Sequence, residues 1–198
     1  GRFWYSLGNG LGNGLDNNWY LDGNNASVVS SDGNKTTVQM GSGYRGDLWL
    51  ARSGKGKIVN VTPADYRYFA IKVGFKSQLV PGKNKPNGCI KLEIFDDGIK
   101  KIGPEYFGTG GDANNRYEIL GASEISTTEP NVLYYDLQSK YKTVTPTDWN
   151  QVFDLVQCKF VIADFPETAQ TYDLYWIRSF KSIEELQAFV DSENNTNE

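Results

Sequence analysis

The chain has 198 residues, a length at which one β-sandwich or barrel can bury a substantial core without stabilising disulfides. It carries 20 Lys and Arg against 24 Asp and Glu, and this formal net charge of -4 argues against a nucleic-acid or anionic-membrane partner. Histidine is absent, which excludes histidine-dependent triads, histidine general bases and histidine-ligated zinc. No apolar run approaches the length of a transmembrane helix.

The first half of the chain predicts short strands separated by loops rich in Gly, Asn and Asp. Residues 6–18 repeat Leu-Gly-Asn-Gly, a turn-forming run because Gly and Asn tolerate a positive φ. Asp32-Gly33-Asn34 separates two β-branched segments and predicts a hairpin. The strands predicted here are Val28–Ser31, Thr36–Met40, Tyr44–Arg52, Ile58–Val61 and Tyr66–Lys76.

The second half ends in the segment that most strongly favours a strand. Tyr172–Phe180 is filled with aromatic and β-branched residues, which suit a pleated, half-buried surface. Strict alternation would place Leu174, Trp176 and Phe180 on one face of this strand, with Ile177 on the other. The other strands predicted in this half are Cys89–Phe95, Ile99–Ile102, Tyr117–Leu120, Val132–Leu137 and a bulged Val152–Phe165, and residues 103–116 are predicted as a loop.

Helix signals are confined to the C-terminal end of the chain. Ser182 followed by Glu185 matches a capping box, in which two side chains satisfy the first free backbone N–H groups of a helix. Ile183, Leu186 and Val190 then fall on one helical face. We expect one short helix or turn here.

The many short strands decide the predicted fold class. Strands with regular turn punctuation and one late helix predict an all-β fold, a jelly-roll β-sandwich of the galactose-binding-like kind. No linker divides the chain, so we expect a single domain over residues 1–198, with 191–198 as a polar tail and the whole as a fragment of a larger multimodular protein. Cys89 and Cys158 differ in strand phase, which favours two buried thiols, although a disulfide stays open as the alternative.

Aromatic residues beside loops are the candidate ligand contacts. Carbohydrate recognition uses flat aromatic faces against sugar C–H groups, and amides, carboxylates or guanidinium groups for the hydroxyls. The candidates are Trp19, Tyr20, Tyr44, Arg45, Asp47, Trp49 and Trp149. The alternative for each Trp is packing against a loop or the end of the sandwich, which is the role we expect for Trp4 and Trp176.

Catalytic and metal-binding patterns are weaker. Glycosidases use two carboxylates that flank the scissile bond, and the nearest candidates are Glu93, Asp96 and Asp97. Asp96-Asp97-Gly98 is more simply typical of a turn, so we predict no catalytic residue and no cofactor. A structural calcium ion stays open, because the loops hold oxygen donors. These donors are Asp22, Asn24, Asn25, Asp32, Asp112, Asn114 and Asn115.

Three segments of the chain carry a resemblance to a known group of domains. They are residues 63–72, Tyr134–Leu137, and Tyr172–Phe180 with the Lys181–Leu186 that follows. They resemble the carbohydrate-binding-module-like jelly-roll domains of surface and secreted polysaccharide-utilisation proteins of gut Bacteroidetes, many of which are described only as domains of unknown function. The resemblance covers mostly framework strands, so it implies fold and setting and assigns no binding residue.

Sequence and resemblance together predict a non-catalytic module that binds a polysaccharide or oligosaccharide. The resemblance implies a location outside the cell or on the outer surface of a Gram-negative bacterium, with covalently linked neighbouring domains. Two alternatives stay open. One is a polysaccharide lyase or glycosidase with an unrecognised site, since a lyase can use Tyr, Arg or Lys in place of histidine. The other is a structural spacer or protein-interaction domain whose aromatic side chains all lie in the core.

Overall fold

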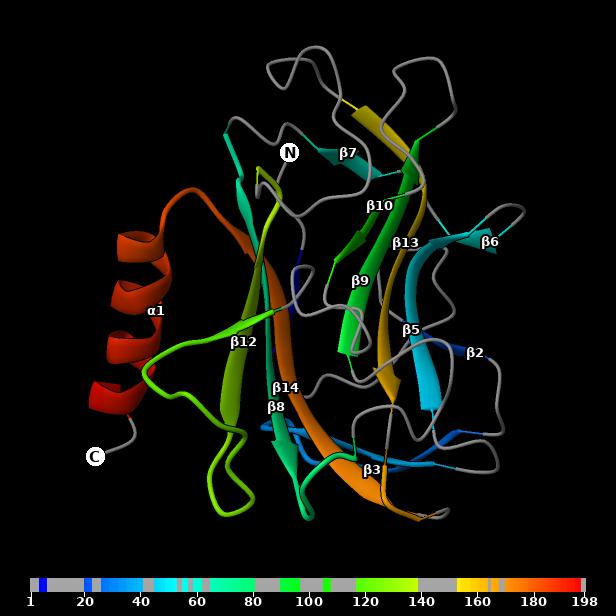
Figure 1. Cartoon of the computed structure of the whole chain (residues 1–198), viewed down its shortest axis with the longest axis vertical. Coiled ribbons are helices and arrows are strands. Elements are labelled where there is room, and N and C mark those ends of the chain that lie inside the picture. Colours follow the sequence, from blue (N-terminus) through cyan, green and yellow to red (C-terminus); the bar gives the residue numbers. More distant parts are fainter. Residues whose placement is uncertain are drawn as a thin grey trace.

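The computed structural model of the chain describes two β-sheets and one C-terminal helix (Figure 1). The described residues are 4–6, 20–22, 26–40, 45–52, 55–56, 59–61, 65–80, 90–96, 105–107, 117–138, 153–163, 165–167 and 170–196. In residues 4–6 and in nearly all of the second sheet, the structure describes the backbone alone.

All strand pairs in both sheets are antiparallel. The first sheet has the order β11-β12-β8-β14-β4-β3, and β1 also pairs with β14. Its strands are β1 (Trp4–Ser6), β3 (Ser27–Ser31), β4 (Thr36–Gln39), β8 (Tyr68–Phe75), β11 (Glu118–Ile119), β12 (Asn131–Asp136) and β14 (Thr171–Phe180). The predicted hairpin is confirmed as β3 and β4, and Tyr172–Phe180 is confirmed as the body of β14.

The second sheet has the order β10-β9-β13-β5-β2, with β6 paired to β5 and β7 paired to β13. Its strands are β2 (Tyr20–Asp22), β5 (Arg45–Arg52), β6 (Lys55–Gly56), β7 (Val59–Val61), β9 (Ile90–Asp96), β10 (Glu105–Phe107) and β13 (Phe153–Ala163). The long strands alternate between the sheets along the chain, from β4 through β5, β8, β9, β12 and β13 to β14, as in a jelly roll. The predicted all-β sandwich with one C-terminal helix is confirmed.

The first sheet builds a core on its face toward the second sheet. Phe69, Ile71 and Val73 alternate along β8 and are fully buried. Leu133 and Tyr135 of β12 lie opposite Ile71 and Phe69 of β8, and both are also fully buried. Figure 1 shows the second sheet on one side of β8 and α1 (Ile183–Thr196) on the other, so the first sheet is covered on both faces.

The strand β14 contains a bulge that changes which residues share a face. Leu174 and Trp176 lie opposite Val73 and Lys72, which are consecutive residues of β8, so Tyr175 is an extra residue at this register shift. Trp176 therefore lies on the outer face with Lys72, whereas Leu174 lies on the inner face with Val73. The predicted alternation that put Leu174 and Trp176 on one face was wrong, because it assumed an unbroken strand.

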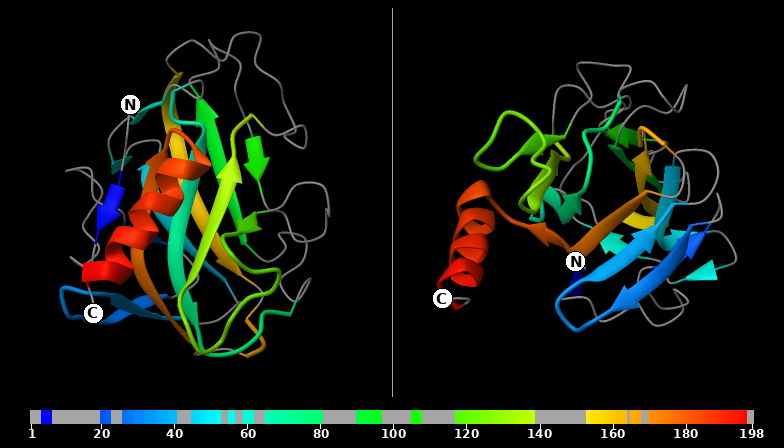
Figure 2. Two further views of the ribbon diagram at one scale, coloured as in Figure 1. Left: turned by 90° about the vertical axis from the view of Figure 1, so that its left-hand side faces the viewer. Right: turned by 90° about the horizontal axis from the view of Figure 1, so that it is seen from below.

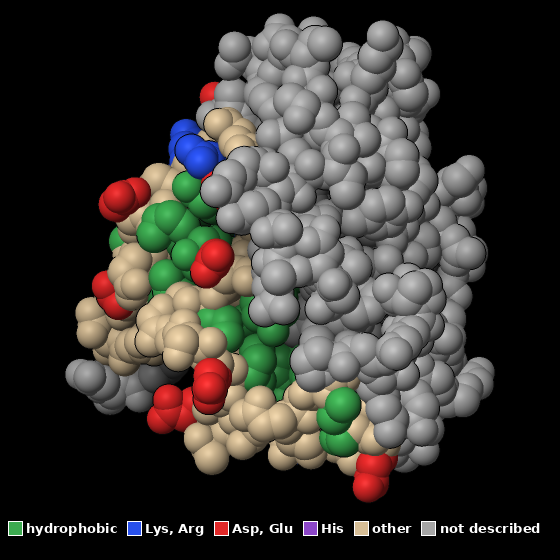
Figure 3. Space-filling model, in the orientation of Figure 1, with side chains coloured by type: hydrophobic (Ala, Val, Ile, Leu, Met, Phe, Trp, Pro, Cys, Tyr) green, Lys and Arg blue, Asp and Glu red, His purple; other side chains and the backbone are tan. Residues whose placement is uncertain are grey.

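The helix α1 packs on the outer face of the first sheet. Trp176 and Phe180 are each 1% exposed and pack with Leu186 of α1 in one hydrophobic cluster, which confirms the predicted packing role of Trp176. Phe189 completes this cover, with its ring centroid 5.3 Å from that of Trp176. Figure 2 looks onto α1 with the sheets behind it, and Figure 3 shows partly buried hydrophobic side chains at the surface between α1 and β12.

The helix begins where the capping pattern predicts. The backbone N–H of Glu185 donates to Ser182 Oγ at 3.0 Å, and Glu185 Oε2 accepts from the backbone N–H of Lys181 at 2.6 Å. The helix then continues to Thr196, so most of the predicted polar tail is helical. No helix in the described part of the chain is long and apolar enough to cross a membrane.

Candidate functional site

The seven predicted ligand contacts divide into two groups. Trp19, Tyr44 and Trp149 lie outside the described residues, as do Ile99–Ile102 and Cys89. The other four contacts lie in strands of the second sheet. Tyr20 begins β2, and Arg45, Asp47 and Trp49 occupy alternate positions of β5.

The register of β2 and β5 brings these four positions onto one face of the sheet. Tyr20 lies directly opposite Trp49, and Asp22 lies directly opposite Asp47. Directly opposed residues of an antiparallel pair share a face, and so do alternate residues of one strand. Tyr20, Arg45, Asp47 and Trp49 therefore share a face. The two strands are neighbours in the sheet, although along the chain the β3–β4 hairpin of the other sheet comes between them.

The same register line continues across the whole second sheet. Trp49 lies opposite Lys159 of β13, Lys159 lies opposite Glu93 of β9, and Glu93 lies opposite Tyr106 of β10. We call Tyr20, Trp49, Lys159, Glu93 and Tyr106 the second-sheet row. It joins five strands and places aromatic residues at both ends of the sheet, with one basic and one acidic residue between them.

Sequence reasoning did not identify Lys159 or Tyr106 as site residues, and it considered Glu93 only as a glycosidase carboxylate. Tyr106 falls in the segment 103–116, which was predicted as a loop; that prediction was wrong for Glu105–Phe107, because a strand of three residues has too little periodicity to be recognised. Lys159 and Glu93 are polar residues at alternating positions of long predicted strands. That alternation was the available signal, but only the register shows that the two residues are neighbours of Trp49.

The adjacent register line of the second sheet has the opposite character. It runs through Leu21, Leu48, Phe160, Leu92 and Phe107. All five of these residues are apolar, whereas every member of the second-sheet row is polar or aromatic. Neighbouring lines of a sheet belong to opposite faces, so the second sheet has one largely apolar face, with Asp96 and Glu105 near its edge, and one face of mixed aromatic and charged residues.

The proposed glycosidase carboxylates are not brought together by the sheet. Glu93 and Asp96 are three positions apart in β9, and an odd separation in a strand places two residues on opposite faces. Asp97, the third carboxylate of that pattern, lies outside the described residues. Within the described part of β9, two carboxylates do not flank a common site.

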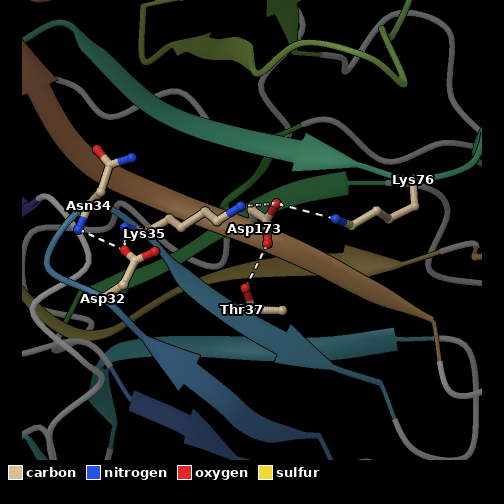
Figure 4. Close-up of polar contacts among 6 residues, drawn as sticks. All are labelled: Asp32, Asn34, Lys35, Thr37, Lys76 and Asp173. Carbon is tan, nitrogen blue, oxygen red and sulfur yellow. Dashed lines mark hydrogen bonds and ion pairs between the residues drawn. The ribbon is translucent and has the colours of Figure 1, made fainter. Parts of the chain in front are cut away.

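The oxygen donors suggested for calcium are only partly described. Asn24, Asn25, Asp112, Asn114 and Asn115 lie outside the described residues, and Asp22 lies in β2. Asp32 has a structural role, because its Oδ1 accepts the backbone N–H groups of Asn34 and Lys35 at 2.9 Å each (Figure 4). Among the described residues, no group of three or more acidic or cysteine side chains is placed to hold a metal ion.

The best-defined polar cluster lies on the first sheet, around Asp173 (Figure 4). Its carboxylate accepts a hydrogen bond from Thr37 Oγ1 at 2.7 Å and lies 3.2 Å from Lys35 Nζ and 3.6 Å from Lys76 Nζ. The hydrogen bond to Asp173, assisted by the carboxylate charge, raises the pKa of Lys35 above its ordinary value. The cluster ties β4 and the end of β8 to β14, which is a structural role.

Comparison with known proteins identifies the family of the chain. The family model described as "Domain of unknown function (DUF4979)" matches residues 10–186. The chain belongs to the DUF4979 family. No curated protein sequence matches it. The DUF4979 match includes all five strands that carry the second-sheet row, and it ends at the fourth residue of α1.

Two solved structures are similar to this DUF4979 chain. One is a low-affinity xylan-binding module, CBM86, from Roseburia intestinalis, with 12% identity, a TM-score of 0.36 and coverage of 93% of this chain and 98% of that chain. The other is a family 11 carbohydrate-binding module from Clostridium thermocellum in complex with a β-1,3-1,4-mixed-linked tetrasaccharide, with 11% identity, a TM-score of 0.44 and coverage of 92% and 96%.

Proposed function

We propose that the chain is a non-catalytic glycan-binding module and that the mixed aromatic and charged face of its second sheet is the binding face. The observation that carries this proposal is the register itself. Four residues chosen from the sequence as sugar contacts, Tyr20, Arg45, Asp47 and Trp49, fall on one face of two paired strands. Aromatic faces pack against the C–H groups of a sugar, and charged groups beside them bind its hydroxyls.

The two faces of the second sheet support this choice. In a β-sandwich the apolar face of each sheet packs against the other sheet. We therefore infer that the apolar line through Leu48 and Phe160 faces the first sheet and that the second-sheet row faces away from it. The first sheet already carries α1 on its own outer face (Figure 1), so the second-sheet row lies on the side of the sandwich opposite to α1.

The carboxylate pair suggested by the sequence gives no support for a glycosidase, because Glu93 and Asp96 fall on opposite faces of β9. The proposed binding face does hold a directly opposed pair, Asp22 and Asp47, so an assay for cleaved glycan belongs to the test below. The setting that we propose is that of the resembled domains: a cell-surface or secreted glycan-utilisation protein of a Gram-negative bacterium, with linked neighbouring domains. Binding of modest affinity would suffice there, because linked domains raise the effective concentration of the module near its glycan.

Calorimetric titration of the wild type and of Trp49→Ala with soluble xylan and mixed-linkage β-glucan tests the proposal. We expect the wild type to bind at least one of them and Trp49→Ala to lose at least tenfold in affinity, about 1.4 kcal/mol, with little change in Tm. Tyr66→Ala is the matched control, because Tyr66 is a half-buried aromatic residue just before β8, and its ring centroid lies 5.5 Å from Lys181 Nζ, directly after β14 of the first sheet.

Three results would contradict the proposal. A Trp49→Ala variant that keeps full affinity would show that this face is not the site. A fall in Tm that corresponds to a loss of about 3–5 kcal/mol in the free energy of unfolding, as for a truncated core Trp, would show that Trp49 is a packing residue. Release of new reducing ends or of unsaturated products during the titration would favour the alternative enzyme.

A further inference from the structure

We propose that the second-sheet row binds an extended, neutral glycan chain laid across the strands, with Tyr106 as the aromatic contact at the edge opposite Tyr20 and Trp49. This inference rests on the proposed function and deepens it, because it specifies the length, the direction and the charge class of the ligand. It also adds three residues to the site: Lys159 and Tyr106, which no sequence pattern singled out, and Glu93, which the sequence suggested only as a glycosidase carboxylate.

The length follows from the geometry of the sheet. The row crosses five strands, and therefore four strand-to-strand steps. Each step is about 4.8 Å, so the row extends over roughly 19 Å. One step is close to the advance of one sugar residue along an extended β-linked chain, so the row matches about four consecutive sugars. A single sugar would reach only the Tyr20–Trp49 end.

The direction follows from the order of residue types. Tyr20 and Trp49 are neighbours at one edge of the sheet, and Tyr106 lies at the opposite edge. Between them, Lys159 and Glu93 supply hydrogen-bonding groups at adjacent positions. A chain of four or more sugars can use both aromatic ends together, whereas a monosaccharide cannot. The row therefore fits an extended stretch of a polysaccharide, with the chain running across the strands.

The charge class follows from the residues that share this face. In the regular part of the sheet, its basic positions are Arg45, Lys91 and Lys159, and its acidic positions are Asp22, Asp47 and Glu93. Beyond the register shifts of β5 and β13, this face also carries Arg52, Lys55 and Asp154, so its described positions hold five basic and four acidic residues and nearly balance. A site for a uronic-acid polymer or a sulfated glycan needs an excess of Lys and Arg to offset the charge of its ligand. The balance on this face favours an uncharged chain.

A length series of oligosaccharides tests the inference. The wild type, Tyr106→Ala and Trp49→Ala are titrated with neutral β-linked gluco- and xylo-oligosaccharides of two to six residues, with oligogalacturonides as the acidic counterpart. We expect wild-type affinity to rise about tenfold between two and five residues and then to level off. Tyr106→Ala should lose that gain while binding the disaccharide as the wild type does. Trp49→Ala should bind every length weakly.

The outcomes separate this inference from the proposed function. If the wild type binds a disaccharide and a hexasaccharide equally, or if Tyr106→Ala binds the hexasaccharide as the wild type does, the row is not the site of an extended chain, yet glycan binding stands. Tighter binding of oligogalacturonides than of neutral chains overturns the charge class alone. If no oligosaccharide and no polysaccharide binds, the proposed function fails and this inference fails with it.

Discussion

At the scale of single residues, Asp173 is the centre of the polar cluster that joins β4, β8 and β14. It is only 7% exposed. Its carboxylate accepts a hydrogen bond from Thr37 Oγ1 and lies between the ammonium groups of Lys35 and Lys76. We expect Asp173→Asn to cost about 1–2 kcal/mol, because the neutral amide weakens the contacts to both ammonium groups but keeps an acceptor for Thr37. Urea unfolding at neutral pH measures this loss.

Lys76→Met provides the matched control for that measurement. The Lys76 side chain is 57% exposed and 3.6 Å from Asp173, so we expect its removal to cost less than about 1 kcal/mol. Equal losses from Asp173→Asn and Lys76→Met would contradict a central role for the carboxylate. Sequence reasoning could not find this cluster, because Lys35 and Asp173 are 138 positions apart and meet only through strand pairing.

At the scale of elements, the turn between β3 and β4 makes a pH-dependent contribution to stability. Asp32 accepts two backbone N–H groups, from Lys35 and Asn34, and these hydrogen bonds lower the pKa of its carboxyl below 3.8. A lowered pKa in the folded state stabilises the fold above the ordinary pKa, and this contribution is lost as the pH falls through the lowered value. We expect the Tm of Asp32→Ala to lie below that of the wild type near neutral pH.

The difference in Tm should shrink as the pH falls into the acid range, and thermal unfolding at a series of pH values measures it. Asp65→Ala, which removes an exposed carboxylate from another turn, is the control and should leave the Tm unchanged throughout. A gap between Asp32→Ala and the wild type that persists unchanged at acid pH would show that the ionised carboxylate is not its cause. The Asp-Gly-Asn pattern identified this turn from the sequence, and the positive φ of 82° at Gly33 explains why it could.

Long strands and the capped helix were predictable from the sequence, whereas the phase within a strand was not. Periodicity located β8 and β14 to within a residue or two, and Ser182 with Glu185 located the start of α1. The bulge at Tyr175 gives no local signal, because it arises from pairing with β8. It reverses the faces of all later residues in β14, and it is what turns Trp176 toward α1.

At the scale of the whole molecule, the proposed function gives the two outer faces of the sandwich different tasks. The face of the first sheet is closed by α1, with Trp176 Nε1 donating to the Glu193 carboxylate at 3.0 Å and Lys72 Nζ 3.5 Å from it. The face of the second sheet carries the second-sheet row. As ligand contacts, sequence reasoning found only the members of that row at one edge of the sheet. The complete row depends on the pairing of five strands whose order in the sheet differs from their order along the chain.

This division of tasks predicts that stability and binding can be changed separately. Leu186 of α1 is fully buried against the first sheet, so Leu186→Ala should cost about 2–5 kcal/mol of stability. Because Leu186 packs on the opposite side of the sandwich from Trp49, its truncation should leave glycan affinity unchanged at temperatures where the variant is folded. Trp49→Ala should do the reverse, and distant sites without shared partners should combine additively.

The double variant Leu186→Ala with Trp49→Ala tests this independence directly. Calorimetric titration should give it the affinity of Trp49→Ala, and urea unfolding should give it the stability of Leu186→Ala, within about 0.5 kcal/mol. A larger interaction free energy in either measurement would mean that the two faces are coupled through the core between the sheets. In that case α1 would influence the binding face through Trp176 and the inner residues of β14, and the separation of tasks would be wrong.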